Sequence, residues 1–89
     1  MPDNRPRPID ELEATIRERQ SASADKSYTA KLLAGGVTKI GEKVLEEAAE
    51  MVEAAGEPDE AGRQHTSREA GDVLYHLMVL LAWRGVTLA

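Results

Sequence analysis

Residues 37–55 read VTKIGEKVLEEAAEMVEAA, and this stretch decides the fold class. Its apolar residues return every three or four positions, which places them on one side of an α-helix. Thr38 is the expected N-cap, and Gly56 with Pro58 ends the run. We therefore predict an amphipathic helix with an apolar stripe made of Val37, Ile40, Val44, Ala48, Met51, Val52 and Ala55.

Two helices are expected before this one. The first begins at Pro8 and carries apolar residues at helical spacing up to a small, polar loop at residues 20–27. The second is short: Ser27 caps it and it runs to Ala34, where the pair Gly35–Gly36 ends it.

The last predicted helix begins between Asp59 and Thr66, runs to about Arg84 and ends at Gly85. Its residues 73–83, VLYHLMVLLAW, are apolar in nearly every direction around the axis, so this helix needs partners on more than one side. No strand-like alternation occurs. We predict an all-α fold, a helical bundle of about four helices per chain that homodimerisation completes.

Composition limits the function classes. The chain has 89 residues, so we expect one domain at 9–89 after a proline-rich, disordered N-terminal arm at 1–8. A formal charge of −5 argues against a general nucleic-acid binder. The absence of cysteine excludes disulfides, thiolate zinc sites and thiol nucleophiles. No signal peptide or membrane span is recognisable, so we expect a cytoplasmic protein with no membrane partner.

Acidic pairs on the two best helices are the strongest candidate for chemistry. Glu47 and Glu50 are three residues apart, as are Glu69 and Asp72, so each pair shares one side of its helix. If the helices pack antiparallel, the four carboxylates can converge. Two such charges 4 Å apart repel by roughly 4 kcal/mol at a dielectric constant of about 20, so the group needs a cation or protons. Oxygen ligands favour Mg²⁺ or Mn²⁺ over Zn²⁺.

A solvated acidic face is the alternative interpretation. Lys43 lies four residues before Glu47 and can be a simple helix-surface partner of that side chain. However, Glu46 and Glu50 form a like-charge pair at the same spacing, which a merely solvated face tends to avoid.

The acids also form a motif: Glu46-Glu47-Ala48-Ala49-Glu50, then residues 51–68, then Glu69-Ala70-Gly71-Asp72. It resembles the motif of the all-α nucleoside-triphosphate pyrophosphatase (MazG-like) superfamily. Three flanking segments are similar to the phosphoribosyl-ATP pyrophosphatase family within it, and the similarity covers about residues 9–88. These segments are SYTAKLL at 27–33, Lys39-Ile40 with Lys43-Val44, and DVLYHLMVLLAWRGV at 72–86.

The resemblance implies Mg²⁺-dependent hydrolysis of phosphoribosyl-ATP to phosphoribosyl-AMP and pyrophosphate, the second step of histidine biosynthesis. It implies that Glu47, Glu50, Glu69 and Asp72 hold the metal and that Glu46 joins Glu47 and Glu50 in catalysis. Two ways of activating the attacking water are left open. Glu46 can act as a general base, or a hydroxide bound to the metal can be the nucleophile. Such relatives often extend beyond the position of Ala89, so we expect a C-terminus that is trimmed or naturally short.

Further residues are candidates for contacts with the substrate, because cations and hydroxyls bind phosphates and SYTAKLL resembles a family signature. His76 is expected to be a hydrogen-bonded core residue rather than a ligand, and Tyr75 and Trp83 are expected to pack or to lie at an interface. The substrate-binding candidates are Ser27, Tyr28, Lys31, Lys39, Lys43 and Arg84, and Thr29 and Arg68 are considered with them.

Two other functions are left open by the sequence. One is a pyrophosphatase for dNTPs or non-standard nucleotides, which keeps the chemistry and changes the substrate. The other is a non-catalytic helical dimerisation module, which releases no pyrophosphate from any nucleotide. An association with the next enzyme of the histidine pathway is also left open.

Overall fold

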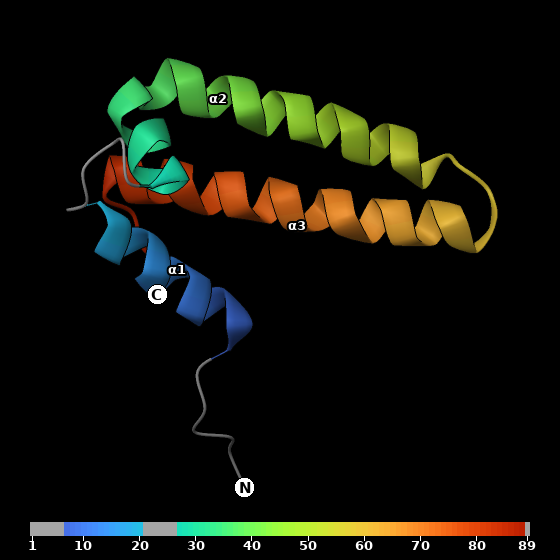
Figure 1. Ribbon diagram of the computed structural model, residues 1–89, viewed down its shortest axis with the longest axis horizontal. Helices are drawn as coiled ribbons and strands as arrows, with labels where there is room; N and C mark the ends of the chain where they lie inside the picture. The colour runs from blue at the N-terminus through green and yellow to red at the C-terminus, as the bar shows by residue number, and fades with distance from the viewer. Residues whose placement is uncertain (1–6, 21–26, 89) are drawn as a thin grey trace, which may run out of the picture.

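The computed structural model describes residues 7–20 and 27–88, and within these ranges all regular structure is α-helical. Helix α1 spans Pro8–Arg19, α2 spans Tyr28–Ala55 and α3 spans Asp59–Arg84. Helices α2 and α3 form a long antiparallel hairpin, and α1 packs near the end of the hairpin where α3 finishes (Figure 1). The all-α prediction is confirmed. The first six residues of the predicted arm, 1–8, lie outside the described residues, as does most of the predicted loop.

The helix count differs from the prediction, because the two central helices are joined. Gly36 has φ 74° and ψ −171°, a combination open essentially to glycine alone, and the ribbon of α2 turns sharply in its first part (Figure 1). Helical hydrogen bonding continues on both sides of this residue, so the described residues contain three helices rather than four. The predicted glycine break is therefore present as a kink, and it replaces the N-cap expected at Thr38.

Other predicted helix ends agree with the structure. The Ser27 hydroxyl accepts a hydrogen bond from the Ala30 N–H at 3.2 Å and caps α2. Helix α3 begins at Asp59, the earlier of the expected limits, and Gly85 ends it with a left-handed φ of 79°.

The core lies where the three helices meet. It is built from five buried residues: Ile16, Leu32, Ile40, Met78 and Val79. Part of the predicted stripe on α2 is not in this core, since Val37 is 51% exposed and Val52 is 75% exposed. Ala54, rather than the predicted Ala55, is the buried residue near the end of α2.

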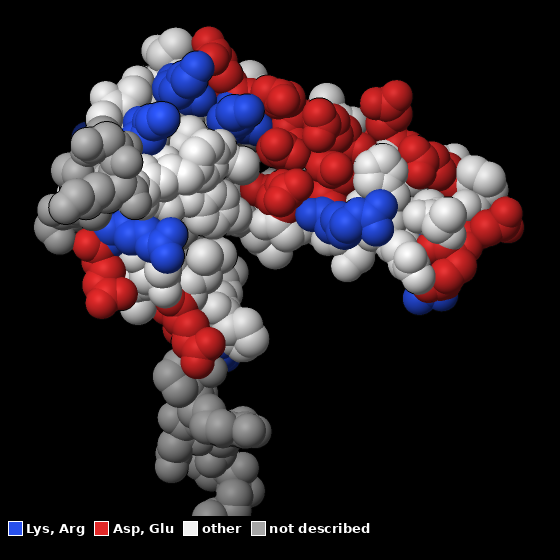
Figure 2. Space-filling model, viewed as in Figure 1, with Lys and Arg blue, Asp and Glu red and all other residues white. Residues whose placement is uncertain are grey.

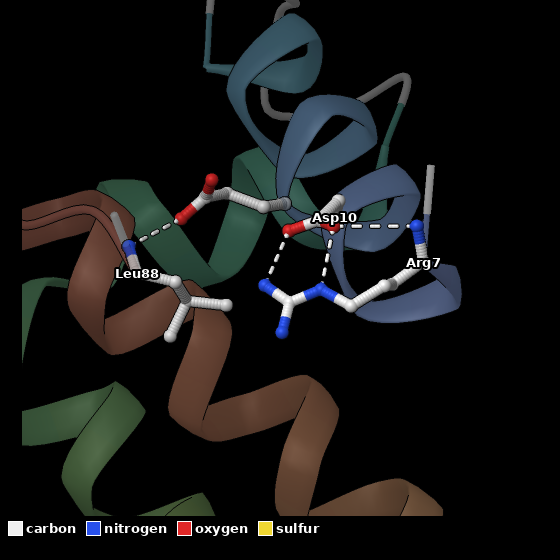
Figure 3. Close-up of polar contacts among 4 residues, drawn as sticks. Arg7, Asp10 and Leu88 are labelled. Atoms are coloured by element: carbon white, nitrogen blue, oxygen red, sulfur yellow. Dashed lines mark hydrogen bonds and ion pairs between the residues drawn. The ribbon is translucent and has the colours of Figure 1, made fainter. Parts of the chain in front are cut away.

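Polar contacts attach α1 to the end of α3. The amide of Gln20 donates to the carbonyl of Ala82 at 3.0 Å, and the backbone N–H of Leu88 donates to Glu13 Oε2 at 3.0 Å. At the other end of α1, the Arg7 guanidinium and backbone N–H both donate to the Asp10 carboxylate, which lowers the pKa of that carboxyl group (Figure 3). The contacts of Gln20 and Glu13 fix where α1 lies against α3, whereas the Arg7–Asp10 pair stabilises the start of α1 itself.

None of the helices within the described ranges has both the length and the apolar character that crossing a membrane requires.

Candidate functional site

The antiparallel packing of α2 and α3 brings acids of both helices together. Among the described residues, Glu47 and Glu50 of α2 and Glu69 of α3 each offer a carboxylate oxygen, and these oxygens all lie within 4.8 Å of one another. We call these three residues the acidic cluster. The spacing within α2 puts two carboxylates on one side of that helix, and the third comes from the facing helix. Figure 2 shows acidic side chains gathered over the middle of α2 and α3.

The charges of this cluster interact strongly. Burial raises the pKa of Glu47 to about 7, and contact with the carboxyl group of Glu69 and the charges of Glu50 and Asp72 act in the same direction. Contact with Glu69 is also the main cause that raises the pKa of Glu50. Near neutral pH the cluster therefore holds a proton, or it requires a cation to be fully ionised.

Glu69 is the acid of the cluster that α3 contributes, and it is largely enclosed. Its side chain is 14% exposed, and its Oε2 atom is buried without a hydrogen-bond partner among the described residues. An unpaired buried carboxylate oxygen costs free energy unless a proton or a cation satisfies it. Together with the oxygens of Glu47 and Glu50, it forms a donor set suited to a hard divalent cation.

Two predicted acids lie outside the cluster. Asp72 is exposed, although its charge contributes to the raised pKa of Glu47. Glu46 is also exposed, and its Oε2 atom lies 3.8 Å from Lys43 Nζ. The ion pair of Lys43 is thus formed with Glu46 rather than with Glu47, the partner that sequence spacing suggested.

The predicted substrate-binding cations are mostly exposed and are spread over α2 and α3. Lys31 and Lys39 are exposed on α2, Lys43 is partly buried, and Arg84 is exposed in the last turn of α3. Arg68 is exposed as well. Figure 2 shows basic side chains over the first part of α2, next to the acidic surface.

Tyr28 and His76 connect the start of α2 to α3. His76 is 6% exposed, and its Nδ1 atom lies 2.9 Å from the carbonyl oxygen of Asp72. Because a carbonyl only accepts, Nδ1 carries the proton and Nε2 accepts from the Tyr28 hydroxyl at 3.2 Å. His76 is therefore a hydrogen-bonded core residue, and it fixes the backbone of Asp72, one of the predicted ligands.

The neighbouring aromatic residues pack against this pair. The rings of Tyr28 and Tyr75 are stacked at a centroid distance of 6.2 Å, and Tyr75 contacts the buried hydroxyl of Thr29. Tyr75 thus packs as predicted, whereas Trp83 is 41% exposed. Of the predicted substrate contacts, Thr29 is enclosed and Tyr28 remains half-exposed at 51%.

Sequence reasoning missed two residues beside the cluster. His65 Nε2 lies 3.4 Å from Glu69 Oε1, and His65 Nδ1 lies 2.9 Å from Glu57 Oε1. The hydrogen bond to Glu57 is the main cause that raises the pKa of His65. The spacing of four residues from His65 to Glu69 could have predicted their contact, because such a pair lies on one side of a helix. The place of Glu57 depends on the turn between α2 and α3, which spacing does not reveal.

Comparisons with known proteins point to one family. A family model described as phosphoribosyl-ATP pyrophosphohydrolase matches residues 9–89. A protein of Rhodopirellula baltica named phosphoribosyl-ATP pyrophosphatase is 57% identical over 81 residues, which are 91% of this chain and 68% of that protein. Proteins of the same name are 53% identical over 78 residues in Dinoroseobacter shibae, covering 88% of this chain and 74% of that protein. In Cereibacter sphaeroides a protein of this name is 49% identical over 81 residues, which are 91% of this chain and 76% of that protein.

Proposed function

The chain belongs to the phosphoribosyl-ATP pyrophosphohydrolase family, and from this premise we propose that it hydrolyses phosphoribosyl-ATP to phosphoribosyl-AMP and pyrophosphate, a step of histidine biosynthesis. The observation that carries the proposal is the acidic cluster. Three carboxylates from two helices lie within 4.8 Å, with a buried oxygen that has no hydrogen-bond partner among the described residues. A merely structural surface has no reason to hold like charges in this way.

The residues present fit a bound Mg²⁺ ion, with Mn²⁺ as the alternative. Glu47, Glu50 and Glu69 would hold it, and Asp72 extends the set on the exposed side. When bound, the ion neutralises charge on the triphosphate and on the leaving pyrophosphate. Each carboxylate projects from a helix rather than from a loop, so the backbone positions of the set are fixed before substrate arrives.

The chain's other polar groups bind and orient the substrate. Lys31, Lys39 and Lys43 present ammonium groups on α2, and the charge of a triphosphate attracts them. Arg84 presents a guanidinium at the end of α3, and Ser27 presents a hydroxyl at the start of α2. Tyr28 would contact the substrate with its half-exposed ring, because its hydroxyl donates to His76. Glu46 lies next to Glu47 and is proposed to accept the proton of the attacking water.

The substrate is tested by measuring pyrophosphate release from phosphoribosyl-ATP and from a panel of dNTPs, with Mg²⁺ present. We expect kcat/KM to be highest for phosphoribosyl-ATP, by at least ~100-fold. A dNTP that is turned over faster would assign the protein to the nucleotide-cleaning pyrophosphatases instead. Absence of pyrophosphate release from every nucleotide would contradict the proposal itself.

A homodimer is part of the proposal, and uncovered apolar surface supports it. On α3, Leu74 is 47% exposed and Leu77 is 38% exposed. Leu74 lines a hollow of about 250 Å³ between α1 and α3, and Figure 2 shows mostly uncharged atoms where these helices meet. A second copy would cover this face. The hollow is lined by Pro8, Ile9, Leu12, Gly71 and Leu74.

An association with the next enzyme of the pathway stays a prediction.

A charge in this apolar face is expected to dissociate the dimer. Leu74→Glu places a carboxylate where the partner would bury it, so sedimentation equilibrium should show a monomer where the wild type is a dimer. Leu45→Glu is the control, because Leu45 is 74% exposed on α2 and does not line the hollow. A wild type that sediments as a monomer, or a dimer that survives Leu74→Glu, would show that this face is not the interface.

A further inference from the structure

A line of three side chains runs from the turn between α2 and α3 to the acidic cluster. Glu57 lies in that turn, and its Oε1 atom is 2.9 Å from His65 Nδ1. The opposite ring nitrogen, Nε2, is 3.4 Å from Glu69 Oε1. The imidazole therefore lies between two carboxylates, one of which belongs to the cluster.

The backbone holds the outer member of this line firmly. The N–H of Glu57 donates to the carbonyl of Ala54 at 3.0 Å, which ties the residue to the end of α2. On its other side, Gly62 of α3 approaches so closely that a Cβ atom there would lie 2.3 Å from the Glu57 carbonyl oxygen. The turn thus places the Glu57 side chain against His65, which projects from the second turn of α3.

The two oxygens of Glu69 have different surroundings as a result. Oε1 faces His65, whereas Oε2 is buried with no hydrogen-bond partner in the described part of the chain. A ring held 3.4 Å from one oxygen restricts the rotation of the carboxylate, and this favours one direction for the other oxygen. Groups that orient metal ligands in this way commonly change metal affinity by about 10–100-fold.

We propose that His65, anchored by Glu57, is a positioning residue that orients Glu69 so that Oε2 is presented to the divalent cation. The proposal rests on the proposed function, because it requires the acidic cluster to bind a metal. It assigns His65 no contact with substrate. Its action is on the affinity of the site for the ion, through the conformation of Glu69.

The test measures Mn²⁺ binding to the full chain without substrate, by the EPR signal of free Mn²⁺. His65→Ala should weaken binding by about 10–100-fold, and His65→Gln, whose amide can reach Glu69 in place of Nε2, should restore most of it. Gln64→Ala, at the exposed neighbouring position on the same helix, should bind as the wild type does. In turnover assays His65→Ala should raise the KM for metal and leave kcat at saturating metal nearly unchanged.

Several outcomes would overturn the proposal. One is a His65→Ala variant that binds Mn²⁺ as tightly as the wild type does. Another is a His65→Gln variant that does not recover Mn²⁺ affinity. Either result would show that a hydrogen-bond donor at this position does not determine metal binding. If His65→Ala does not fold, Glu57→Ala decides the matter: weakened Mn²⁺ binding supports the link, and unchanged binding refutes it. Pyrophosphate release by the wild type with unchanged Mn²⁺ binding in these variants would refute the role of His65 while leaving the proposed function standing.

Discussion

A protein carrying Glu47→Gln is expected to fold normally and to lose at least ~100-fold in kcat with phosphoribosyl-ATP, the scale on which a preorganised charge contributes to catalysis. The substitution keeps the size of the side chain and removes its charge. Glu47 contacts Glu69 and is acted on by the charges of Glu50 and Asp72, so the loss of its charge weakens the whole acidic cluster. Initial rates of pyrophosphate release at saturating Mg²⁺ measure the effect.

Glu53→Gln provides the matched control for this experiment. It makes the same chemical change on the same helix, at an exposed position outside the acidic cluster, so its kcat should equal that of the wild type. Circular dichroism and thermal unfolding establish that both variants are folded. If Glu47→Gln unfolds the protein, the carboxylate is structural and the proposed role of the cluster is wrong.

The metal-free protein is expected to lose stability as the pH rises from about 4.5 to about 7. The pKa of Glu47 is about 7 in the folded chain and 4.5 in the reference state, so within this window the folded protein holds a proton that the unfolded chain has released. The contribution of protonated Glu47 to the free energy of unfolding is therefore fully present below pH 4.5. It is lost as the pH rises through the folded pKa of about 7. Above that pH, the ionised side chain faces the charges of Glu50, Glu69 and Asp72.

Urea unfolding in EDTA across this pH range measures the effect, with Glu47→Gln as the comparison. The variant cannot ionise at this position, so the difference in unfolding free energy between the two proteins isolates Glu47 from other titrating groups such as His65. The variant should gain stability relative to the wild type as the pH rises. Mg²⁺ should restore the wild type above pH 7 and have much less effect on the variant. If the unfolding free energies of the two proteins in EDTA changed with pH in parallel, the pKa of Glu47 would not be raised in the folded protein.

The local sequence was sufficient to predict most helix ends, because capping and termination depend on a few neighbouring residues. Ser27 caps α2, and Gly85 ends α3 in the left-handed conformation that favours glycine. Gly36 also interrupts the helix where glycines predicted a break. The interruption is a kink of one residue within α2 rather than a gap between two helices.

Burial along α2 was predicted less well. Helical spacing assigned Val52 to the apolar stripe, yet it is 75% exposed, while Ala54 is fully buried. Spacing gives the directions of side chains around one axis, but the line along which α3 contacts α2 selects the direction that becomes core. Lys43 shows the same limit, since Glu46 and Glu47 were both within reach and the structure pairs it with Glu46.

The sequence by itself determined the all-helical fold and the two acidic pairs, since both follow from residue spacing along a single helix. Only the tertiary structure decided which acids meet: Glu47, Glu50 and Glu69 converge, while Asp72 lies on the exposed side. It alone brought Glu57 against His65, because the turn between the helices sets that approach. The physical reason is that charge interactions depend on distances between helices, and packing and turn geometry fix those distances.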